Sequence, residues 1–309
     1  MRILLASKID GEAEAQLRGS HDVVSRIGAS EPVLADAAQD RQVIVFRSGV
    51  TISQAVLQAP DLRLLVRAGS GLDNLDLETV RARHIVLQRV PGPGAQAVAE
   101  MTFAHILGLA RNVVLGDRLL RQGRWAKSEL TSYNLTGKTL GVVGLGSIGT
   151  RVAELGLAWG MHVVGCVSNW SAERHEVYEA QGIELLPGCA DVLKRADFVT
   201  LHVPLDETTR PLIGRAELQR MKPTAFLVNI ARGGVVDEEA LLEALREGRL
   251  AGAGLDVHVR EGEGHVSPLA ELPNVILTPH IGAATIDAQR EIGRLVVQII
   301  QSFSEEQGL

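Results

Sequence analysis

Short apolar runs alternate with longer helical patterns along almost the whole chain of 309 residues. This alternation predicts parallel strands joined by helical crossovers, which is an α/β architecture. The runs fall into two groups separated by a long helical pattern over residues 97–122, so we expect two domains. The expected strands are residues 3–6, 22–25, 43–46, 62–66 and 85–88 in the first group, and 140–143, 163–167, 183–186, 198–202, 226–230, 253–257 and 275–278 in the second.

The second group of strands fits a doubly wound Rossmann sheet, which binds a dinucleotide. Residues 285–305 show apolar side chains at helical spacing beyond the last strand, and we expect this helix to pack on the first domain. The Rossmann domain would then be inserted in a discontinuous, flavodoxin-like substrate-binding domain. The expected boundaries are 1–97 and 284–309 for the substrate-binding domain and 98–283 for the dinucleotide-binding domain.

Composition excludes several classes of protein. The net charge of −6 and pI of about 5.9 give no basic field for nucleic acid or an anionic membrane surface. No segment reaches the ~18 apolar residues of a membrane span, and residues 1–10 lack the features of a signal peptide. Cys166 and Cys189 have no metal-ligand neighbours at useful spacing, so we expect two thiols, no metal and a cytoplasmic location.

The helical pattern over residues 97–122 is apolar around much of its circumference, with Phe103, Ile106 and Leu107 among its apolar residues. A helix of this kind is buried from several sides. Either it forms a core between domains or it is shared with a second subunit. We expect a homodimer.

A G-x-G-x-x-G pattern occupies residues 144–149. It follows an expected strand and opens a helical pattern, which is the context that distinguishes a dinucleotide-binding turn from an ordinary glycine-rich turn. Gly144 permits the tight turn, Gly146 lets the backbone approach a pyrophosphate, and Gly149 allows close packing of helix on strand. The sequence therefore predicts a nicotinamide dinucleotide as cofactor.

The acidic residue that binds the ribose 2′-hydroxyl in many such sites is missing. Ser168 and Asn169 stand at the end of the second strand, where that carboxylate is expected. Without it a 2′-phosphate is not repelled, and Arg174 and His175 are the nearest cationic candidates. The choice between NAD and NADP stays open.

Three residues in the second half carry suitable chemistry for reducing a 2-oxo acid: Arg232, Glu261 and His280. Arg232 follows a strand and precedes two glycines, and its planar fork suits a carboxylate. His280 can donate a proton to a carbonyl oxygen, and a carboxylate near it favours the charged imidazole.

Ordered motifs over nearly the whole length identify the chain as similar to the D-isomer-specific 2-hydroxyacid dehydrogenases, most closely to the phosphoglycerate dehydrogenase branch without its C-terminal regulatory domain. They are Arg-Ala-Gly-Ser-Gly-Leu-Asp-Asn at 67–74, Val-Ala-Glu at 98–100, Gly-Arg-Trp at 123–125, the glycine pattern, His-Val-Pro-Leu at 202–205, Ala-Arg-Gly-Gly-Val-Val-Asp at 231–237, Leu-Asp-Val at 255–257 and Thr-Pro-His-Ile-Gly at 278–282.

The resemblance implies an NAD- or NADP-dependent oxidoreductase that acts on a 2-hydroxy or 2-oxo acid. Arg232 would grip the substrate carboxylate, His280 would be the acid–base residue, and Glu261 would orient His280. Asp256 would contact the nicotinamide carboxamide. Further contacts to the cofactor are implied for Ser147, Ile148, Val203, Ile230 and Gly282.

For the substrate, the resemblance implies Arg47 and Arg67, which end strands of the first domain, with backbone groups from Ser70 and Gly71. Two Arg residues favour a second anionic group on the substrate, as in phosphoglycerate, although an exposed Arg pair is an equal alternative. Gly94 stands where that branch often has Asn, so glyoxylate and hydroxypyruvate stay open as substrates.

The loop that carries Glu261 departs from the family pattern, which has Phe and a Glu-Pro step there. This chain has His258 and Gly262 instead. We expect a looser backbone near Glu261 and a structural or solvent-facing His258.

The alternative from another functional class is a protein that binds the nucleotide without turnover, as in corepressor relatives.

Overall fold

A computed structural model of the protein describes residues 1–308. Its chain forms two compact units, Met1–Ala95 with Ala283–Leu309, and Gln96–Gly282. The sequence patterns place the divisions after residues 97 and 283, and the structure places them after Ala95 and Gly282. The first unit is thus made of two chain segments, because the second unit is inserted between them.

Among the described residues the first unit contains a five-stranded parallel sheet in the order β2-β1-β3-β4-β5, which is the flavodoxin-like order. Neighbouring residues of β1 enter different cores, Ile3 and Leu5 on one face and Leu4 on the other, as the two-residue period of a strand requires. The strands are β1 (Arg2–Leu5), β2 (Asp22–Ser25), β3 (Val43–Phe46), β4 (Leu64–Arg67) and β5 (Val86–Arg89). The helices are α1 (Gly11–Ser20), α2 (Glu31–Ala38), α3 (Gln54–Leu57), α4 (Leu77–Ala82) and α12 (Ile286–Glu306).

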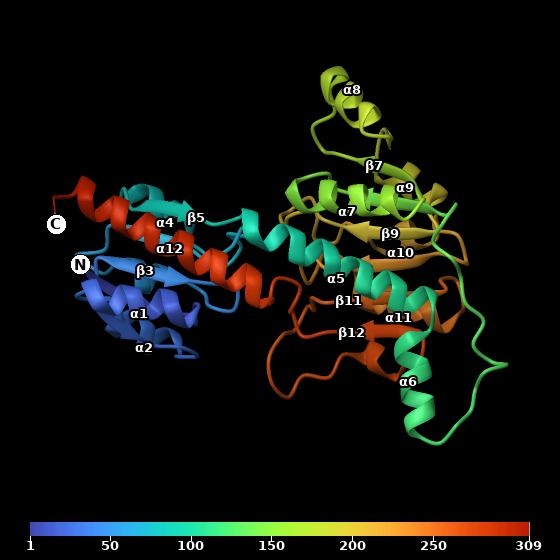
Figure 1. Ribbon diagram of the computed structural model, residues 1–309, viewed down its shortest axis with the longest axis horizontal. Coiled ribbons are helices and arrows are strands. Elements are labelled where there is room, and N and C mark those ends of the chain that lie inside the picture. Colours follow the sequence, from blue (N-terminus) through green and yellow to red (C-terminus); the bar gives the residue numbers. More distant parts are fainter. Residues whose placement is uncertain (309) are drawn as a thin grey trace. The chain divides into compact units, whose positions relative to one another are not determined.

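The C-terminal helix α12 packs on α1, as expected (Figure 1). Thr285 caps its first turn by accepting a hydrogen bond from the Ala288 N–H. A side chain at Gly293 would lie 2.9 Å from the Cβ atoms of Ala13 and Asp10. A glycine there therefore lets the two helices approach closely.

The second unit contains, within the described residues, a seven-stranded parallel sheet in the order β12-β11-β10-β9-β6-β7-β8. The order reverses beside β6, as in a Rossmann sheet, and the reversal places the ligand site at the carboxyl end of the strands. The strands are β6 (Thr139–Val143), β7 (His162–Cys166), β8 (Ile183–Leu185), β9 (Phe198–Leu201), β10 (Phe226–Asn229), β11 (Gly252–Leu255) and β12 (Val275–Leu277). The other elements are α7 (Ser147–Ala158), α8 (Ala172–Ala180), α9 (Cys189–Arg195), α10 (Arg215–Leu218), α11 (Glu238–Arg246) and the 3-10 helix η1 (Pro268–Glu271).

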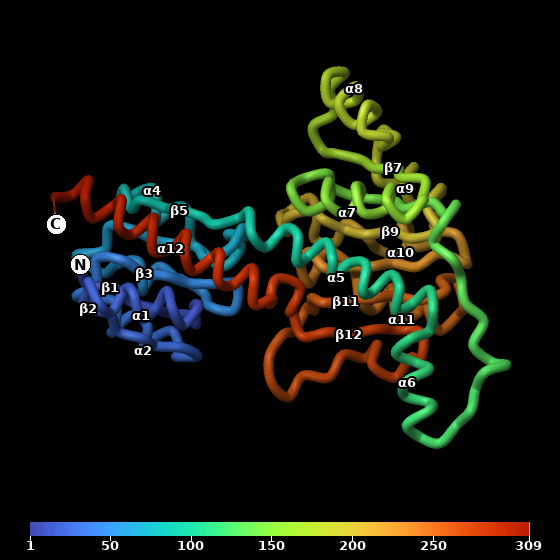
Figure 2. Tube along the Cα trace, in the orientation of Figure 1, coloured from blue at the N-terminus to red at the C-terminus, as the bar shows by residue number. Residues whose placement is uncertain are grey.

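The expectation of one helix over residues 97–122 is wrong. The chain forms α5 (Gly92–Ala110) and α6 (Val113–Arg121), bent by 61°. Asn112 joins them with a φ of +53°, and a residue in the left-handed region cannot continue a helix. Beyond α6 an extended loop leads to β6 (Figure 2). No single helix among residues 1–308 is long and apolar enough to cross a membrane. Taken together, α5 and α6 reach that length and apolar composition, but they are bent relative to each other.

Candidate active site

The glycine-rich turn between β6 and α7 leaves no room for side chains at two positions. Gly144 has a φ of +94°, and a Cβ there would lie 2.7 Å from the carbonyl oxygen of His202. A Cβ on Gly149 would lie 1.9 Å from the carbonyl oxygen of Gly144. A Cβ on Gly146 would meet open space, so the backbone at this position is accessible to a ligand.

The N-terminus of α7 is suited to an anion. Gly146 is its N-cap and supplies no capping side chain, so the first N–H groups of this 12-residue helix, which include those of Ser147 and Ile148, are not satisfied by such a cap. Unsatisfied N–H groups and the helix dipole favour a negatively charged group. These features fit the pyrophosphate of a dinucleotide.

His202 lies behind the glycine turn as a neutral residue. Its Nε2 atom is 2.9 Å from the Thr200 hydroxyl, and burial lowers its pKa to about 3. Its Nδ1 atom is buried without a hydrogen-bond partner among the described residues. The next residue, Val203, would lie 3.1 Å from a Cβ at Gly144 and therefore borders the turn. Because His202 is neutral, it adds no positive charge beside the glycine turn.

The edge of the site after β7 carries no acidic side chain at the expected position. Ser168 and Asn169 are both exposed there. The Arg174 guanidinium donates a hydrogen bond to the Asn169 carbonyl oxygen (3.3 Å), and Ser171 caps α8. Arg174, on the first turn of α8, therefore lies next to the residues that replace the ribose-binding carboxylate.

Arg232 lies in a tight turn after β10 that Asn229 holds. The buried Asn229 side chain accepts a hydrogen bond from the Ala231 N–H (3.1 Å) and donates one to the Arg232 carbonyl oxygen (3.0 Å). Asn at the end of a strand commonly forms such side-chain turns, which is the signal by which the sequence could have identified it.

His280 follows β12 in a backbone conformation that is uncommon for residues with side chains. Its φ is +54°. Asp256, at the end of β11, holds this turn: its carbonyl oxygen accepts from the His280 N–H (2.7 Å), and its carboxylate accepts from the N–H groups of Ile281 (2.9 Å) and Gly282 (2.7 Å). The buried Asp256 thus stabilises the conformation that directs the His280 side chain.

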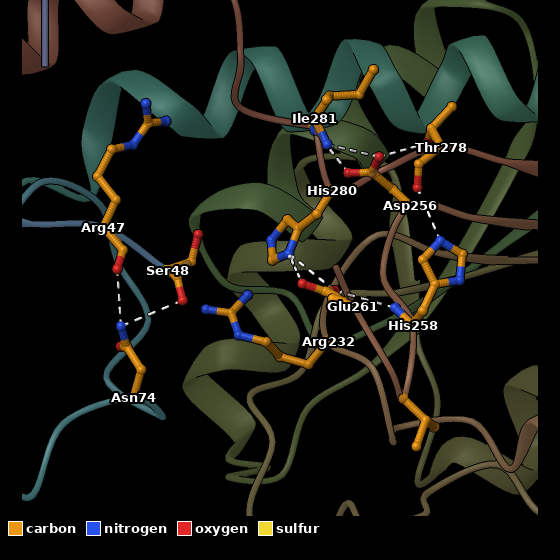
Figure 3. Close-up of polar contacts among 12 residues, drawn as sticks. Arg47, Ser48, Asn74, Arg232, Asp256, His258, Glu261, Thr278, His280 and Ile281 are labelled. Carbon is orange, nitrogen blue, oxygen red and sulfur yellow. Dashed lines mark hydrogen bonds and ion pairs between the residues drawn. The ribbon is translucent and has the colours of Figure 1, made fainter. Parts of the chain in front are cut away.

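Glu261 reaches the imidazole of His280 from the loop after β11 (Figure 3). Its Oε2 and Oε1 atoms lie 2.9 and 3.1 Å from Nδ1 of His280. Burial raises the pKa of Glu261, but the hydrogen bond to His280 and the charges of His280 and His258 outweigh it, so its pKa lies below the ordinary value. Because an ionised carboxylate can only accept, Nδ1 carries the hydrogen and Nε2 is left for a substrate.

A chain of buried polar groups supports this end of the sheet. The Thr278 hydroxyl donates to the Asp256 carboxylate (2.5 Å) and lies 3.0 Å from Nε2 of His105 on α5. A Cβ at Gly282 would lie 3.0 Å from both Asp256 and Ile230, so the three predicted cofactor residues lie together. His105 and Thr278 join this network through contacts between distant parts of the sequence, which no local pattern indicates.

Arg47 and Arg67, which we expect to bind the substrate, lie at the carboxyl edge of the sheet in the first unit. Arg67 is only 3% exposed; its guanidinium donates to the Gly71 carbonyl oxygen (2.7 Å) and lies over the Phe46 ring. The alternative of an exposed Arg pair is therefore wrong for Arg67. Arg47 is partly buried, which lowers its pKa, and its N–H donates to Ser7. Gly71 and its neighbour Ser70 belong to the loop that Arg67 holds.

Among residues 1–308, no group of three or more His, Cys, Asp or Glu side chains could hold a metal ion. The chemistry available in the described part of the chain is thus that of a nucleotide turn, an Arg, a His–Glu pair and their hydrogen-bonded supports.

Residues 103–282 match the family described as D-isomer specific 2-hydroxyacid dehydrogenase, NAD binding domain. The chain is 38% identical over 302 residues to a D-3-phosphoglycerate dehydrogenase of Methanocaldococcus jannaschii, covering 97% of this chain but 57% of that protein. The chain thus spans little more than half the length of this curated relative.

Two further comparisons cover nearly all of both proteins. The chain is 34% identical to a hydroxypyruvate reductase of Thermotoga maritima, covering 100% of this chain and 99% of that protein. A solved structure of an NADPH-dependent glyoxylate/hydroxypyruvate reductase from Sinorhizobium meliloti, in complex with NADP and malonate, is 28% identical with a TM-score of 0.86, covering 98% of this chain and 93% of that one. Both sheets, the nucleotide turn and these likenesses agree, and the chain belongs to the D-isomer-specific 2-hydroxyacid dehydrogenase family.

Proposed function

We propose that the protein is an NAD(P)-dependent D-2-hydroxyacid dehydrogenase, which interconverts a 2-oxo acid and a D-2-hydroxy acid. The observation that carries this proposal is the pair of hydrogen bonds between the Glu261 carboxylate and Nδ1 of His280, at the carboxyl edge of the Rossmann sheet. An oriented His with a free Nε2 is what protonation of a substrate carbonyl requires.

Arg232 would bind the carboxylate of the substrate. Asn229 holds the backbone of its turn, and its guanidinium donates a hydrogen bond to the Ala231 carbonyl oxygen (2.7 Å), which restrains the side chain. A planar guanidinium can donate two parallel hydrogen bonds to a carboxylate, which orients the 2-oxo group as well as attracting it. Binding of this kind supplies the orientation on which a fast transfer depends.

His280 would donate the proton from Nε2 to the carbonyl oxygen in the reductive direction and take it back in the oxidative direction. Glu261 would keep the ring oriented and stabilise the imidazolium. A nicotinamide nucleotide held by residues 144–149, Val203, Ile230, Asp256 and Gly282 would supply the hydride. The proton and the hydride together account for the two hydrogens that convert a 2-oxo acid to a 2-hydroxy acid.

The substrate that the residues support best is a small 2-oxo acid such as glyoxylate or hydroxypyruvate. The buried Arg67 guanidinium already donates a hydrogen bond to the Gly71 carbonyl oxygen of its own loop. This contact weakens the case that Arg47 and Arg67 together bind a substrate phosphate. Arg47, a cation at the end of β3, keeps open the second class, a 2-oxo acid with a distal phosphate or carboxylate.

A panel of 2-oxo acids assayed with NADH and with NADPH tests the proposal. Oxidation of the reduced nucleotide with glyoxylate, hydroxypyruvate or phosphohydroxypyruvate is expected, and the ratio of kcat/KM values ranks the two substrate classes. Tight nucleotide binding with no turnover on any member of the panel would contradict the proposal and favour a binding module.

Replacing Ser168 by Asp is expected to change the preference between the two nucleotides by about tenfold or more in favour of NADH, because a carboxylate there repels a 2′-phosphate and accepts from a 2′-hydroxyl. The measurement is the ratio of kcat/KM for NADH to that for NADPH. Ser168→Asn, which adds a side chain of similar size without charge, is the control. An equal ratio in the Asp and Asn variants would show that this edge does not contact the ribose.

We also propose a homodimer. Within the described chain α6 has no buried residue, and Val113 (58%), Leu120 (59%) and the following Trp125 (79%) are strongly exposed. Exposed large apolar side chains on one short segment are typical of a subunit interface, and a second copy would cover them symmetrically. Sedimentation gives the mass: twice the 33.1 kDa of one chain is expected, and 33.1 kDa at micromolar concentration would contradict the proposal.

The thiols support a cytoplasmic location. Cys166 and Cys189 are both free, and burial raises their pKa to about 11 and about 12. Unpaired cysteines are normal in a reducing compartment.

A further inference from the structure

We propose that His258 is a positioning residue that holds Glu261 against His280 in an exposed, glycine-rich loop. Its catalytic consequence rests on the proposed function, whereas its structural consequence does not.

The loop that carries Glu261 has little packing of its own. Residues 256–267 contain no helix or strand, and every residue from Val259 to Val266 is exposed. Gly262 and Gly264 have φ values of +122° and +80°. A glycine-rich segment without buried side chains loses much conformational entropy when it is ordered, so polar ties must determine where Glu261 lies.

His258 provides two of these ties. Its backbone N–H donates to Oε1 of Glu261 (3.2 Å), and its ring Nε2 lies 3.0 Å from the carbonyl oxygen of Thr278 (Figure 3). Because a carbonyl oxygen only accepts, Nε2 is the protonated nitrogen. The same carbonyl oxygen accepts from the His280 N–H (3.1 Å). One residue therefore connects the carboxylate with the backbone that leads to the imidazole.

The backbone of His258 also abuts the turn that carries Arg232. A Cβ on Gly233 would lie 1.9 Å from the His258 carbonyl oxygen and 2.9 Å from the Val259 nitrogen. The Val259 N–H in turn donates to Glu238 on α11 (2.8 Å). His258 is thus the point at which the segments of Arg232, Glu261 and His280 meet.

The His258 ring is positioned for support and not for reaction. Its Nδ1 atom is buried and has no hydrogen-bond partner among the described residues, and its Nε2 atom is bonded to the Thr278 carbonyl oxygen, so neither ring nitrogen is directed at a substrate. The Thr278 hydroxyl is in turn bonded to two buried groups, the Asp256 carboxylate and the His105 imidazole. The ring therefore completes a network whose other members hold the His280 turn.

Three variants test the role of the side chain. His258→Leu removes the donor to the Thr278 carbonyl oxygen, whereas His258→Gln keeps an N–H near the Nε2 position. His265→Leu is the control, because it makes the same His-to-Leu substitution at an exposed histidine of the same loop. His258→Leu is expected to lower kcat by about 10–100-fold with little change in KM for the nucleotide, since small misplacement of a catalytic group can cost ~10²-fold. The Gln variant should recover most of kcat, and His265→Leu should retain it.

A double-mutant cycle separates positioning from general damage. In a Glu261→Gln background, where the carboxylate is already absent, the further change His258→Leu is expected to lower kcat by less than about twofold, because coupled residues are not additive. A full additional loss would overturn the claim that His258 acts through Glu261. If the Leu variant does not fold, His258→Asn, whose amide is too short to reach Thr278, replaces it in both experiments.

Amide hydrogen exchange over residues 257–266 gives a readout that needs no turnover. Exchange is expected to be faster in His258→Leu than in wild type or in His258→Gln, because the loop opens locally. Unchanged exchange together with unchanged kcat would overturn the inference. A wild-type protein without turnover on any 2-oxo acid would instead contradict the proposed function, and the exchange result would still decide whether His258 holds the loop.

Discussion

Replacing His280 by Asn is expected to lower kcat for reduction of a 2-oxo acid by about 10²–10⁴-fold, the range for loss of a general acid. Asn keeps an amide N–H near the position of Nδ1, so the bond to Glu261 can persist while the donor at Nε2 is lost. Asn also tolerates the φ of +54° at this position better than most residues, which limits damage to the backbone. The loss therefore reports on proton transfer.

The measurement is single-turnover oxidation of NADH or NADPH together with the Kd of the nucleotide. We expect the Kd to change by less than about twofold, because the interaction removed acts in the transition state. His162→Asn is a matched control: His162 is exposed and begins β7 at the opposite end of the strands. Undiminished single-turnover rates in His280→Asn would remove His280 from the reaction.

Replacing Arg232 by Leu is expected to lower kcat/KM for a 2-oxo acid by about 10²–10⁴-fold. Each charge-assisted hydrogen bond contributes about 1.5–3 kcal/mol, so two of them correspond to roughly 3–6 kcal/mol. Unlike the His280 variant, this one should raise KM for the acid as well as lower kcat. Arg232→Lys keeps the charge but loses the planar fork, and an intermediate loss is expected.

A substrate analogue separates carboxylate binding from other effects of the Arg232 variant. The neutral amide of a 2-oxo acid should be a poor substrate of the wild-type protein, and Arg232→Leu should reduce its turnover little further. Arg220→Leu, at an exposed position of the same unit, controls for the loss of a positive charge. An equal loss on the acid and on the amide would show that Arg232 does not bind the carboxylate.

The sequence predicted most elements of the fold because local periodicity encodes them. The expected strands lie within a few residues of β1 to β12, and the glycine turn lies between a strand and a helix, as expected. The bend at Asn112 was missed, because hydrophobic periodicity continues through a residue whose left-handed conformation interrupts the helix. Backbone conformation at a single residue leaves little trace in such a pattern.

Residue chemistry and position pointed to Arg232 and His280, whereas the resemblance to the family was needed to choose Glu261 over Glu263 in the same loop. Tertiary structure decided what those groups contact. The Glu261–His280 bonds join residues 19 positions apart, and Asp256 holds a turn 24 to 26 positions away. The burial of Arg67 in its own loop and the contact of His258 with Thr278 likewise depend on how segments pack. Sequence determined which chemistry was available, and packing of distant segments determined which atoms meet, because hydrogen bonds require positions that only the folded backbone sets.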